Sequence, residues 1–153
     1  MRISAIVPTL NEAAYICATL DALAPLRARG HDVIVVDGGS TDATVALATG
    51  KADRVITAAR GRARQMNAGA RIASADVLLF VHADTRLPED ADRAIVRGLA
   101  QDGRGWGRFD VRIESRHPLL GIVGKAMNFR LILQLPDMQE SVSVLFRFFV
   151  MVN

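Results

Sequence analysis

The sequence predicts an α/β fold, in which a mostly parallel sheet carries helices on both faces. Short runs rich in Val, Ile and Leu alternate with longer stretches whose apolar residues recur every three or four positions. This alternation is typical of βαβ units, and successive units build a parallel sheet. Right-handed crossovers should bring the ends of the first, second and fourth strands to one edge of that sheet.

The first predicted unit consists of one strand and one helix. The apolar run Ile3–Val7 forms the strand, and Pro8 should stop it. Apolar residues at helical spacing then predict a helix over Glu12–Arg29, which ends at Gly30.

The second unit begins with a strand over Asp32–Val36. Ser40 or Thr41 should cap the following helix, which runs to about Thr49. Asp42 then falls in the first turn of this helix, where a negative charge is favourable.

The rest of the chain continues the pattern. We expect a weaker strand over Arg54–Thr57, a helix over Arg62–Ala73 and a strongly apolar strand over Val77–Val81. Pro, Glu and Asp then open a helix over Pro88–Ala100. Apolar and charged residues alternate over Phe109–Ile113, which predicts an edge strand.

Composition excludes several classes of protein. The 153 residues suffice for one domain, half of them are hydrophobic, and the net charge of +3 is mild. Arginine supplies most of the positive charge without interleaved aromatic residues, so no nucleic-acid partner is expected. Cys17 is the single cysteine and suits a reducing compartment. No apolar run reaches the roughly 20 residues of a membrane span. We expect a cytoplasmic protein, with peripheral contact at the inner face of the membrane left open.

Polar groups follow the first strand in Pro8-Thr9-Leu10-Asn11-Glu12. Thr9 and Asn11 offer hydrogen-bonding groups at the strand tip, and the helix that follows would present free N–H groups to an anion. The alternative is structural, with Asn11 as an N-cap and Pro8 as a strand stop. This segment alone does not decide between the two.

The second strand ends in Asp37-Gly38-Gly39-Ser40-Thr41-Asp42. A carboxylate directly after a strand can accept hydrogen bonds from a base or a ribose hydroxyl. The two glycines allow a tight turn and the close approach of a flat ring. A structural turn would need the glycines but not Asp37, so we favour a binding role for Asp37 and assign Asp42 to the helix start.

A basic segment opens the third predicted helix. Arg60, Arg64 and Asn67 should face the same crevice, where guanidinium groups suit a diphosphate. The alternative is a solvated basic face of the helix. Gly69 should allow this helix to pack closely on the sheet.

Asp84 follows the most apolar strand, at the edge where open α/β sheets bind their ligands. Beside His82, its carboxylate is well placed to hold a divalent cation against a phosphate-bearing substrate. The alternative is that Asp84 caps the helix near Pro88 or closes a turn.

These four segments, in this order, resemble the family 2 glycosyltransferases. They are most similar to a bacterial family 2-like subgroup that has His-Ala-Asp-Thr in place of an Asp-x-Asp motif. The resemblance covers about residues 2–130. It implies the GT-A fold, a Rossmann-like sheet that binds a nucleoside diphosphate sugar, with a UDP-sugar expected, for inverting transfer to an unidentified acceptor. The implied residues are Thr9, Glu12 and Asp37 for the nucleoside, Arg60, Arg64 and Asn67 for the nucleotide side, and Asp84 for Mg²⁺ or Mn²⁺.

The sequence departs from the family in two places. His82 replaces one carboxylate of the Asp-x-Asp motif, and it is a candidate metal ligand, although a hydrogen bond to substrate is favoured. After Arg130, the family's Gly-Asp-Gln segment and the acidic pair that supplies the catalytic base are both absent, so no catalytic residue is assigned. Asp137 and Glu140 do not have the spacing of that pair.

The composition also changes after residue 130. We therefore divide the chain into a nucleotide-sugar-binding domain, residues 1–130, and a divergent tail, residues 131–153, which suggests a frameshift or a truncation. The β-prone stretch Val142–Val152 could pair with another chain. The alternative function is a catalytically inactive, truncated remnant that still binds nucleotide. A dinucleotide oxidoreductase is disfavoured, because no Gly-x-Gly-x-x-Gly follows the first strand.

Overall fold

The computed structural model describes residues 1–102, 106–107 and 148–152. These residues belong to one compact unit, formed by Met1–Gly107 and Arg147–Asn153. Its strands are β1 (Ile3–Thr9), β2 (Asp32–Asp37), β3 (Arg54–Thr57), β4 (Val77–Val81), β5 (Trp106–Gly107) and β6 (Phe148–Val152). Its helices are α1 (Ile16–Ala28), α2 (Thr44–Ala48), α3 (Arg62–Ile72) and α4 (Ala91–Asp102).

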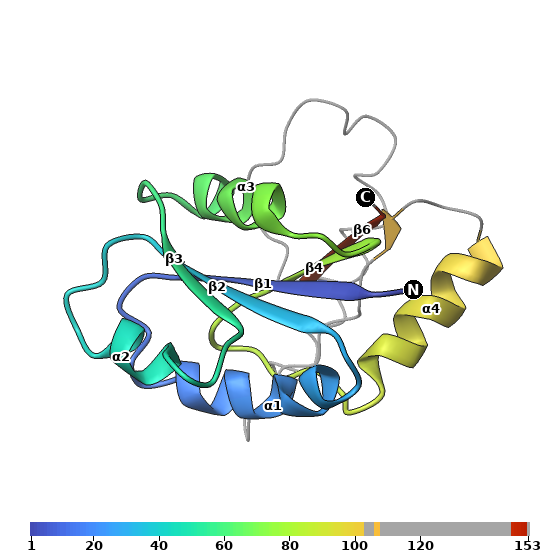
Figure 1. Cartoon of the computed structure of the whole chain (residues 1–153), viewed down its shortest axis with the longest axis horizontal. Coiled ribbons are helices and arrows are strands. Elements are labelled where there is room, and N and C mark those ends of the chain that lie inside the picture. Colours follow the sequence, from blue (N-terminus) through green and yellow to red (C-terminus); the bar gives the residue numbers. More distant parts are fainter. Residues whose placement is uncertain (103–105, 108–147, 153) are drawn as a thin grey trace, which may run out of the picture. The chain divides into compact units, whose positions relative to one another are not determined.

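The described strands form one sheet in the order β3-β2-β1-β4-β6-β5. The first four are parallel, and β6 runs antiparallel to both β4 and β5. Helices α1 and α2 cover one face of the sheet and α3 covers the other (Figure 1). This arrangement confirms the predicted α/β fold with helices on both faces.

The strand β1 continues through Pro8, which was expected to stop it. Pro8 pairs with Val36 of β2, and the strand ends only at Thr9, opposite Asp37. The proline is tolerated because β4 pairs with β1 only as far as Ile6. At Pro8, the side of β1 that faces β4 therefore has no paired strand. Proline has no N–H, but none is needed on that side.

The helix α1 begins four residues later than predicted, and α2 begins two or three residues later. The chain before α1 turns at Glu12, whose carbonyl accepts hydrogen bonds from the N–H groups of Tyr15 and Ile16. Ser40 and Thr41 do not cap α2, which begins at Thr44. The polar groups of residues 11–13 and 40–44 bond to each other instead, as described below, and this holds both segments out of the helical conformation.

The end of the β-prone stretch forms β6 within this chain. Its residues pair with the whole of β4, from Val77 opposite Val152 to Val81 opposite Phe148. The predicted edge strand Phe109–Ile113 lies outside the described residues, as does most of the tail that begins at residue 131. No helix of the described part is long and apolar enough to cross a bilayer.

The core consists of two apolar layers, one on each face of the sheet. Alternate strand residues face α3, and Met66 and Ala70 of that helix pack against them. The buried members of this layer are Ile6, Ile34, Val36, Leu78 and Phe80. The opposite layer contains the intervening strand residues and the buried apolar positions of α1, which are Ile16, Leu20, Leu23 and Leu26.

The close approach of α3 to the sheet depends on Gly69. A Cβ atom at this position would lie 2.5 Å from Cγ2 of Ile6 and 3.1 Å from Cγ2 of Val36. We expect Gly69→Ala to destabilise the protein by about 1–3 kcal/mol, the usual cost of overpacking a core, because the helix must move away from the strands. Urea unfolding measures this difference.

Gly98, in the middle of α4, is the matched control. A Cβ atom there would have no atom within 4 Å. Gly98→Ala should be neutral or stabilising by up to about 1 kcal/mol, because alanine is the better helix former. Equal effects of the two substitutions would contradict the close packing of α3 at Gly69.

Candidate functional site

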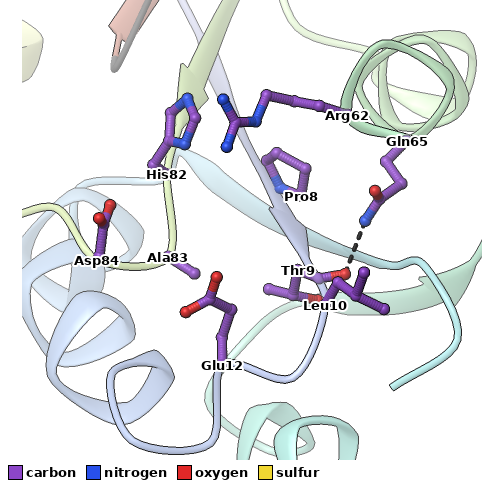
Figure 2. Close-up of a pocket in the computed structure, with 9 residues that line it drawn as sticks. All are labelled: Pro8, Thr9, Leu10, Glu12, Arg62, Gln65, His82, Ala83 and Asp84. Carbon is purple, nitrogen blue, oxygen red and sulfur yellow. Dashed lines mark hydrogen bonds between the residues drawn. The ribbon is translucent and has the colours of Figure 1, made fainter. Parts of the chain in front are cut away.

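The switch in strand order places a crevice at the carboxyl end of β1. From β1 the chain continues to β2 and β3 on one side, and β4 then returns to the other side. Ligands of open α/β sheets bind where the order reverses in this way. The pocket found at this point is lined by Pro8, Thr9, Leu10, Glu12, Arg62, Gln65, His82, Ala83 and Asp84 (Figure 2).

Two carboxylates form the acidic side of this pocket. Glu12 comes from the segment after β1 and Asp84 from the segment after β4 (Figure 2). Burial raises the pKa of the Glu12 carboxyl, and the negative charge of Asp84 raises it further, while the positive charge of Arg62 opposes both effects. The two carboxylates therefore repel each other, and a cation bound beside them would relieve that repulsion.

The donor set of the acidic side fits a hard divalent cation. Carboxylate oxygens are the ligands that Mg²⁺ prefers, and it commonly takes one or two from the protein and the rest from water and substrate phosphates. Within the described residues no group of three or more His, Cys, Asp or Glu side chains could hold a metal alone. Asp84, with Glu12 nearby, would thus hold Mg²⁺ or Mn²⁺ only together with other oxygen ligands.

The other side of the pocket is basic. Arg62, the first residue of α3, extends toward His82, and both side chains lie across the pocket from the two carboxylates (Figure 2). Within the described part of the chain, the Arg62 side chain makes no hydrogen bond or ion pair, although its positive charge acts on Glu12. Its guanidinium can therefore donate two parallel bonds to the oxygens of an anion.

The segment that carries Asp84 is fixed from two directions. The Thr19 hydroxyl of α1 donates to the Ala83 carbonyl, and the N–H of Thr85 donates to the His82 carbonyl at 3.1 Å. The Thr85 hydroxyl also donates to Oδ1 of Asp84 at 3.2 Å. Asp84 thus closes a turn, as the structural alternative supposed, and its carboxylate still lines the pocket.

Gln65 holds the ends of β1 and β2 in place beneath the pocket. Its Nε2 donates to the carbonyl of Thr9 at 2.7 Å and to that of Val36 at 2.8 Å, and the residue is only 4% exposed. Its amide also lies against Gly38, where a Cβ atom would be 3.0 Å from Cδ of Gln65. A side chain at position 38 would therefore crowd the Gln65 amide that makes these bonds.

Asp37 lies at the same edge as Thr9 and Asp84, which confirms that the three strand ends converge. Asp37 is 3% exposed, and its carboxylate accepts hydrogen bonds from the N–H groups of Gly39 and Ser40, each at 2.8 Å, and from the Ser40 hydroxyl. Burial tends to raise the pKa of Asp37, but these hydrogen bonds outweigh it and lower the pKa. Asp37 does not line the pocket, and contact with a nucleoside stays a prediction for it.

Three N–H groups that precede α1 are already occupied, whereas the sequence led us to expect free N–H groups at the start of the helix. The N–H groups of Asn11, Glu12 and Ala13 donate to side chains of the segment after β2, at 2.9, 2.8 and 3.1 Å. Asn11 is not an N-cap either, since it has a left-handed backbone with φ of 55°. A bound anion would thus need other donors, and Arg62 lies in the pocket.

The three basic-segment residues singled out from the sequence lie elsewhere. Arg60, Arg64 and Asn67 are exposed and none of them lines the pocket. The buried residues Gln65 and Gly69 fix which face of α3 meets the sheet. Because a helix turns by about 100° per residue, Arg64 and Asn67 fall on the opposite face. Their contacts with a nucleotide stay predictions.

Sequence reasoning passed over Arg62 and Gln65, although both lie in the segment that it selected. Both residues could have been identified by counting back along the helix from Gly69. Gly69 was already expected to face the sheet, and Gln65 lies four residues before it, on the same face. Arg62 lies a further three residues back, at the end of the helix that points to the strand ends.

The sequence profile of Glycosyl transferase family 2 matches residues 4–137. The PGL/p-HBAD biosynthesis glycosyltransferase of Mycobacterium tuberculosis (strain ATCC 25177 / H37Ra) is 38% identical over 93 residues. That match covers 56% of this chain and 36% of the relative, so the chain spans only part of the length of the curated proteins that it resembles.

Two solved structures share the fold. The mannosyltransferase PcManGT from Pyrobaculum calidifontis, in complex with GDP-Man and Mn²⁺, is 28% identical, with a TM-score of 0.63, over 72% of this chain and 35% of that one. Glucosyl-3-phosphoglycerate synthase from Mycobacterium tuberculosis, in complex with Mn²⁺, UDP and glucosyl-3-phosphoglycerate, is 20% identical, with a TM-score of 0.66. This second match covers 98% of this chain and 56% of the synthase.

Proposed function

This chain belongs to glycosyl transferase family 2, and we propose that it binds a nucleoside diphosphate sugar in the pocket and transfers the sugar to an acceptor hydroxyl. The separation of charge in the pocket supports this function most strongly. Glu12 and Asp84 lie on one side, and Arg62 with His82 lies on the other. A diphosphate that carries a divalent cation has the complementary distribution of charge.

The reaction is a substitution at the anomeric carbon of the donor sugar. The acceptor oxygen forms a bond to this carbon as the bond to the diphosphate oxygen breaks, and the nucleoside diphosphate leaves with the electron pair. Attack from the face opposite the leaving group inverts the configuration, in keeping with the proposed inverting class. A divalent cation held by Asp84 would neutralise charge on the leaving diphosphate. Arg62 would stabilise the same charge from the other side of the pocket.

The acceptor hydroxyl must give its proton to a base during this step. We assign no residue to that role. Asp137 and Glu140, which lack the spacing of the family's acidic pair, lie outside the described residues. The alternative is therefore a chain that binds the donor but does not transfer the sugar.

The ligands of related proteins support the choice of donor and cation. PcManGT was solved with GDP-Man and Mn²⁺, and the mycobacterial synthase with UDP and Mn²⁺. We propose a UDP-sugar as the donor and Mg²⁺ or Mn²⁺ as the cation for this chain.

A thermal-shift experiment with UDP, GDP and UDP-sugars, each with and without Mn²⁺, tests donor binding. At a ligand concentration of about 100 times Kd, binding to the folded protein alone should raise Tm by roughly 5 °C or more. The shift should require Mn²⁺. NAD⁺ serves as the control because its diphosphate joins two nucleosides through their 5′ oxygens and is not bonded to an anomeric carbon. Equal shifts with NAD⁺, or none with any sugar nucleotide, would contradict the proposal.

Release of UDP from a UDP-sugar then separates the two functions. Turnover supports an active transferase, whereas binding without turnover supports the inactive remnant.

A further inference from the structure

The two segments that follow β1 and β2 are joined by a regular set of hydrogen bonds. We call residues 10–15 loop 1 and residues 38–44 loop 2. Three successive N–H groups of loop 1 each donate to a different side chain of loop 2: Asn11 to Ser40, Glu12 to Thr44 and Ala13 to Asp42. In return, the N–H of Thr41 donates to the Asn11 side-chain oxygen at 2.8 Å. We refer to these four contacts as the inter-loop hydrogen bonds.

Carboxylates fix the orientation of the two hydroxyl groups in this set. The Ser40 hydroxyl donates to Asp37, and the Thr44 hydroxyl donates to Oδ1 of Asp42 at 2.5 Å. A hydroxyl has one proton to donate, so each oxygen must turn a lone pair toward its loop 1 amide. The acceptors for Asn11 and Glu12 are therefore held in place before any ligand binds.

Thr44 is the most enclosed of these side chains, with 0% exposure at the start of α2. Its partner, Glu12, has a backbone that is held at both ends. The Glu12 N–H donates to Thr44 Oγ1 at 2.8 Å, and the Glu12 carbonyl accepts from Tyr15 and Ile16, each at 2.9 Å. The position from which the Glu12 side chain enters the pocket thus depends on the Thr44 hydroxyl.

We propose that Thr44 is a positioning residue, which holds the Glu12 carboxylate in the pocket opposite Arg62 and beside Asp84. The inference rests on the proposed function, because Glu12 matters for ligand binding only if a cation and a diphosphate occupy the pocket. Thr44 lies outside the pocket lining, and its hydroxyl reaches the pocket through the backbone of Glu12. It follows that the effects of Thr44 and Glu12 on ligand affinity overlap rather than add.

A double-mutant cycle tests this dependence. The affinity for UDP in saturating Mn²⁺ is measured by calorimetry for the unaltered chain, Thr44→Val, Glu12→Gln and the double variant. Valine has the shape of threonine without the hydroxyl group. Each single change should weaken binding roughly 5- to 30-fold, in the range of couplings between residues that act as a unit. In the Glu12→Gln background, Thr44→Val should change the affinity by no more than about twofold.

Two matched variants separate positioning from general stability. Thr44→Ser keeps the hydroxyl and should keep the affinity for Mn²⁺ and UDP within about twofold of the unaltered chain. Thr49→Val removes a hydroxyl from the end of α2 that bonds to the Val45 carbonyl and not to loop 1, and it should also leave the affinity unchanged. If Thr44→Val does not fold, Asp42→Asn takes its place in the cycle. Thr44 and Ala13 donate to different oxygens of Asp42, and the NH2 group that replaces one of these oxygens cannot accept a hydrogen bond.

Each remaining outcome overturns a defined part of the argument. Two results would overturn the positioning role: losses of UDP affinity that multiply in the double variant, or no loss of affinity in Glu12→Gln. In both cases, UDP binding by the unaltered chain would still support the proposed function. If the unaltered chain does not bind UDP in Mn²⁺, the proposed function fails and the positioning role fails with it.

Discussion

Replacing Asp84 with asparagine should abolish the Mn²⁺-dependent part of UDP binding. The substitution keeps the size of the side chain and removes its charge. Two unit charges about 4 Å apart attract by about 4 kcal/mol at the effective dielectric constant near a protein surface, so the loss should be roughly 100-fold or more in the presence of Mn²⁺. Calorimetry with UDP, with and without Mn²⁺, measures the two affinities.

The comparison without metal is the control for Asp84. UDP alone should bind weakly to both proteins, and it should bind the asparagine variant no less tightly, since a negative charge that repels the diphosphate has been removed. Thermal unfolding without ligand shows whether the variant is folded. An unchanged affinity for UDP in Mn²⁺ would exclude Asp84 as the residue that holds the cation.

Replacing Arg62 with glutamine should weaken UDP binding roughly 10- to 100-fold, the equivalent of the 1.5–3 kcal/mol that a hydrogen bond to a charged group contributes. Arg62 lines the pocket and within the described residues makes no other hydrogen bond or ion pair. Its loss should therefore affect the ligand more than the fold. The affinity is measured with Mn²⁺ at saturation, so that the two effects are separated.

Arg64→Gln provides a matched control on the same helix. It removes the same charge two residues away, from an exposed position on the opposite face of α3. The affinity should fall by no more than about threefold, which is the scale of a screened surface charge. If Arg64→Gln weakened binding as much as Arg62→Gln does, the sequence-based choice of Arg64 would be correct. The face that α3 turns toward the pocket in this structure would then differ from the one in the ligand-bound protein.

Most of the fold could be predicted because it depends on patterns that are local in the chain. The apolar runs at Ile3, Asp32 and Val77 each gave a strand of the parallel sheet, and α3 begins at the predicted residue, Arg62. The convergence of Thr9, Asp37 and Asp84 at one edge also followed, because strand ends in a parallel sheet must share an edge. The starts of α1 and α2 could not be predicted in the same way, since contacts between two distant segments decide them.

The site was predicted less completely than the fold. Thr9, His82 and Asp84 line the pocket at the strand ends where the sequence places them, and Glu12, which the family resemblance named, lines it too. The arginine of α3 that lines the pocket was not identified, because a row of arginines does not reveal which face of its helix meets the sheet. Packing at Gly69 and the two hydrogen bonds of Gln65 decide that face, and Arg62 is the arginine that they direct into the pocket.

The sequence by itself determined the order of strands and helices, the edge at which polar side chains gather, and the family to which the chain belongs. Only the tertiary structure decided that Glu12 lies with Asp84 and opposite Arg62, and that the loop 1 amides are occupied by Ser40, Thr44 and Asp42. The physical reason is the range of the interactions. Hydrophobic periodicity is expressed within a few residues, whereas the charges and hydrogen bonds of the pocket join residues some 30 to 70 positions apart, and they exist only once the sheet has formed.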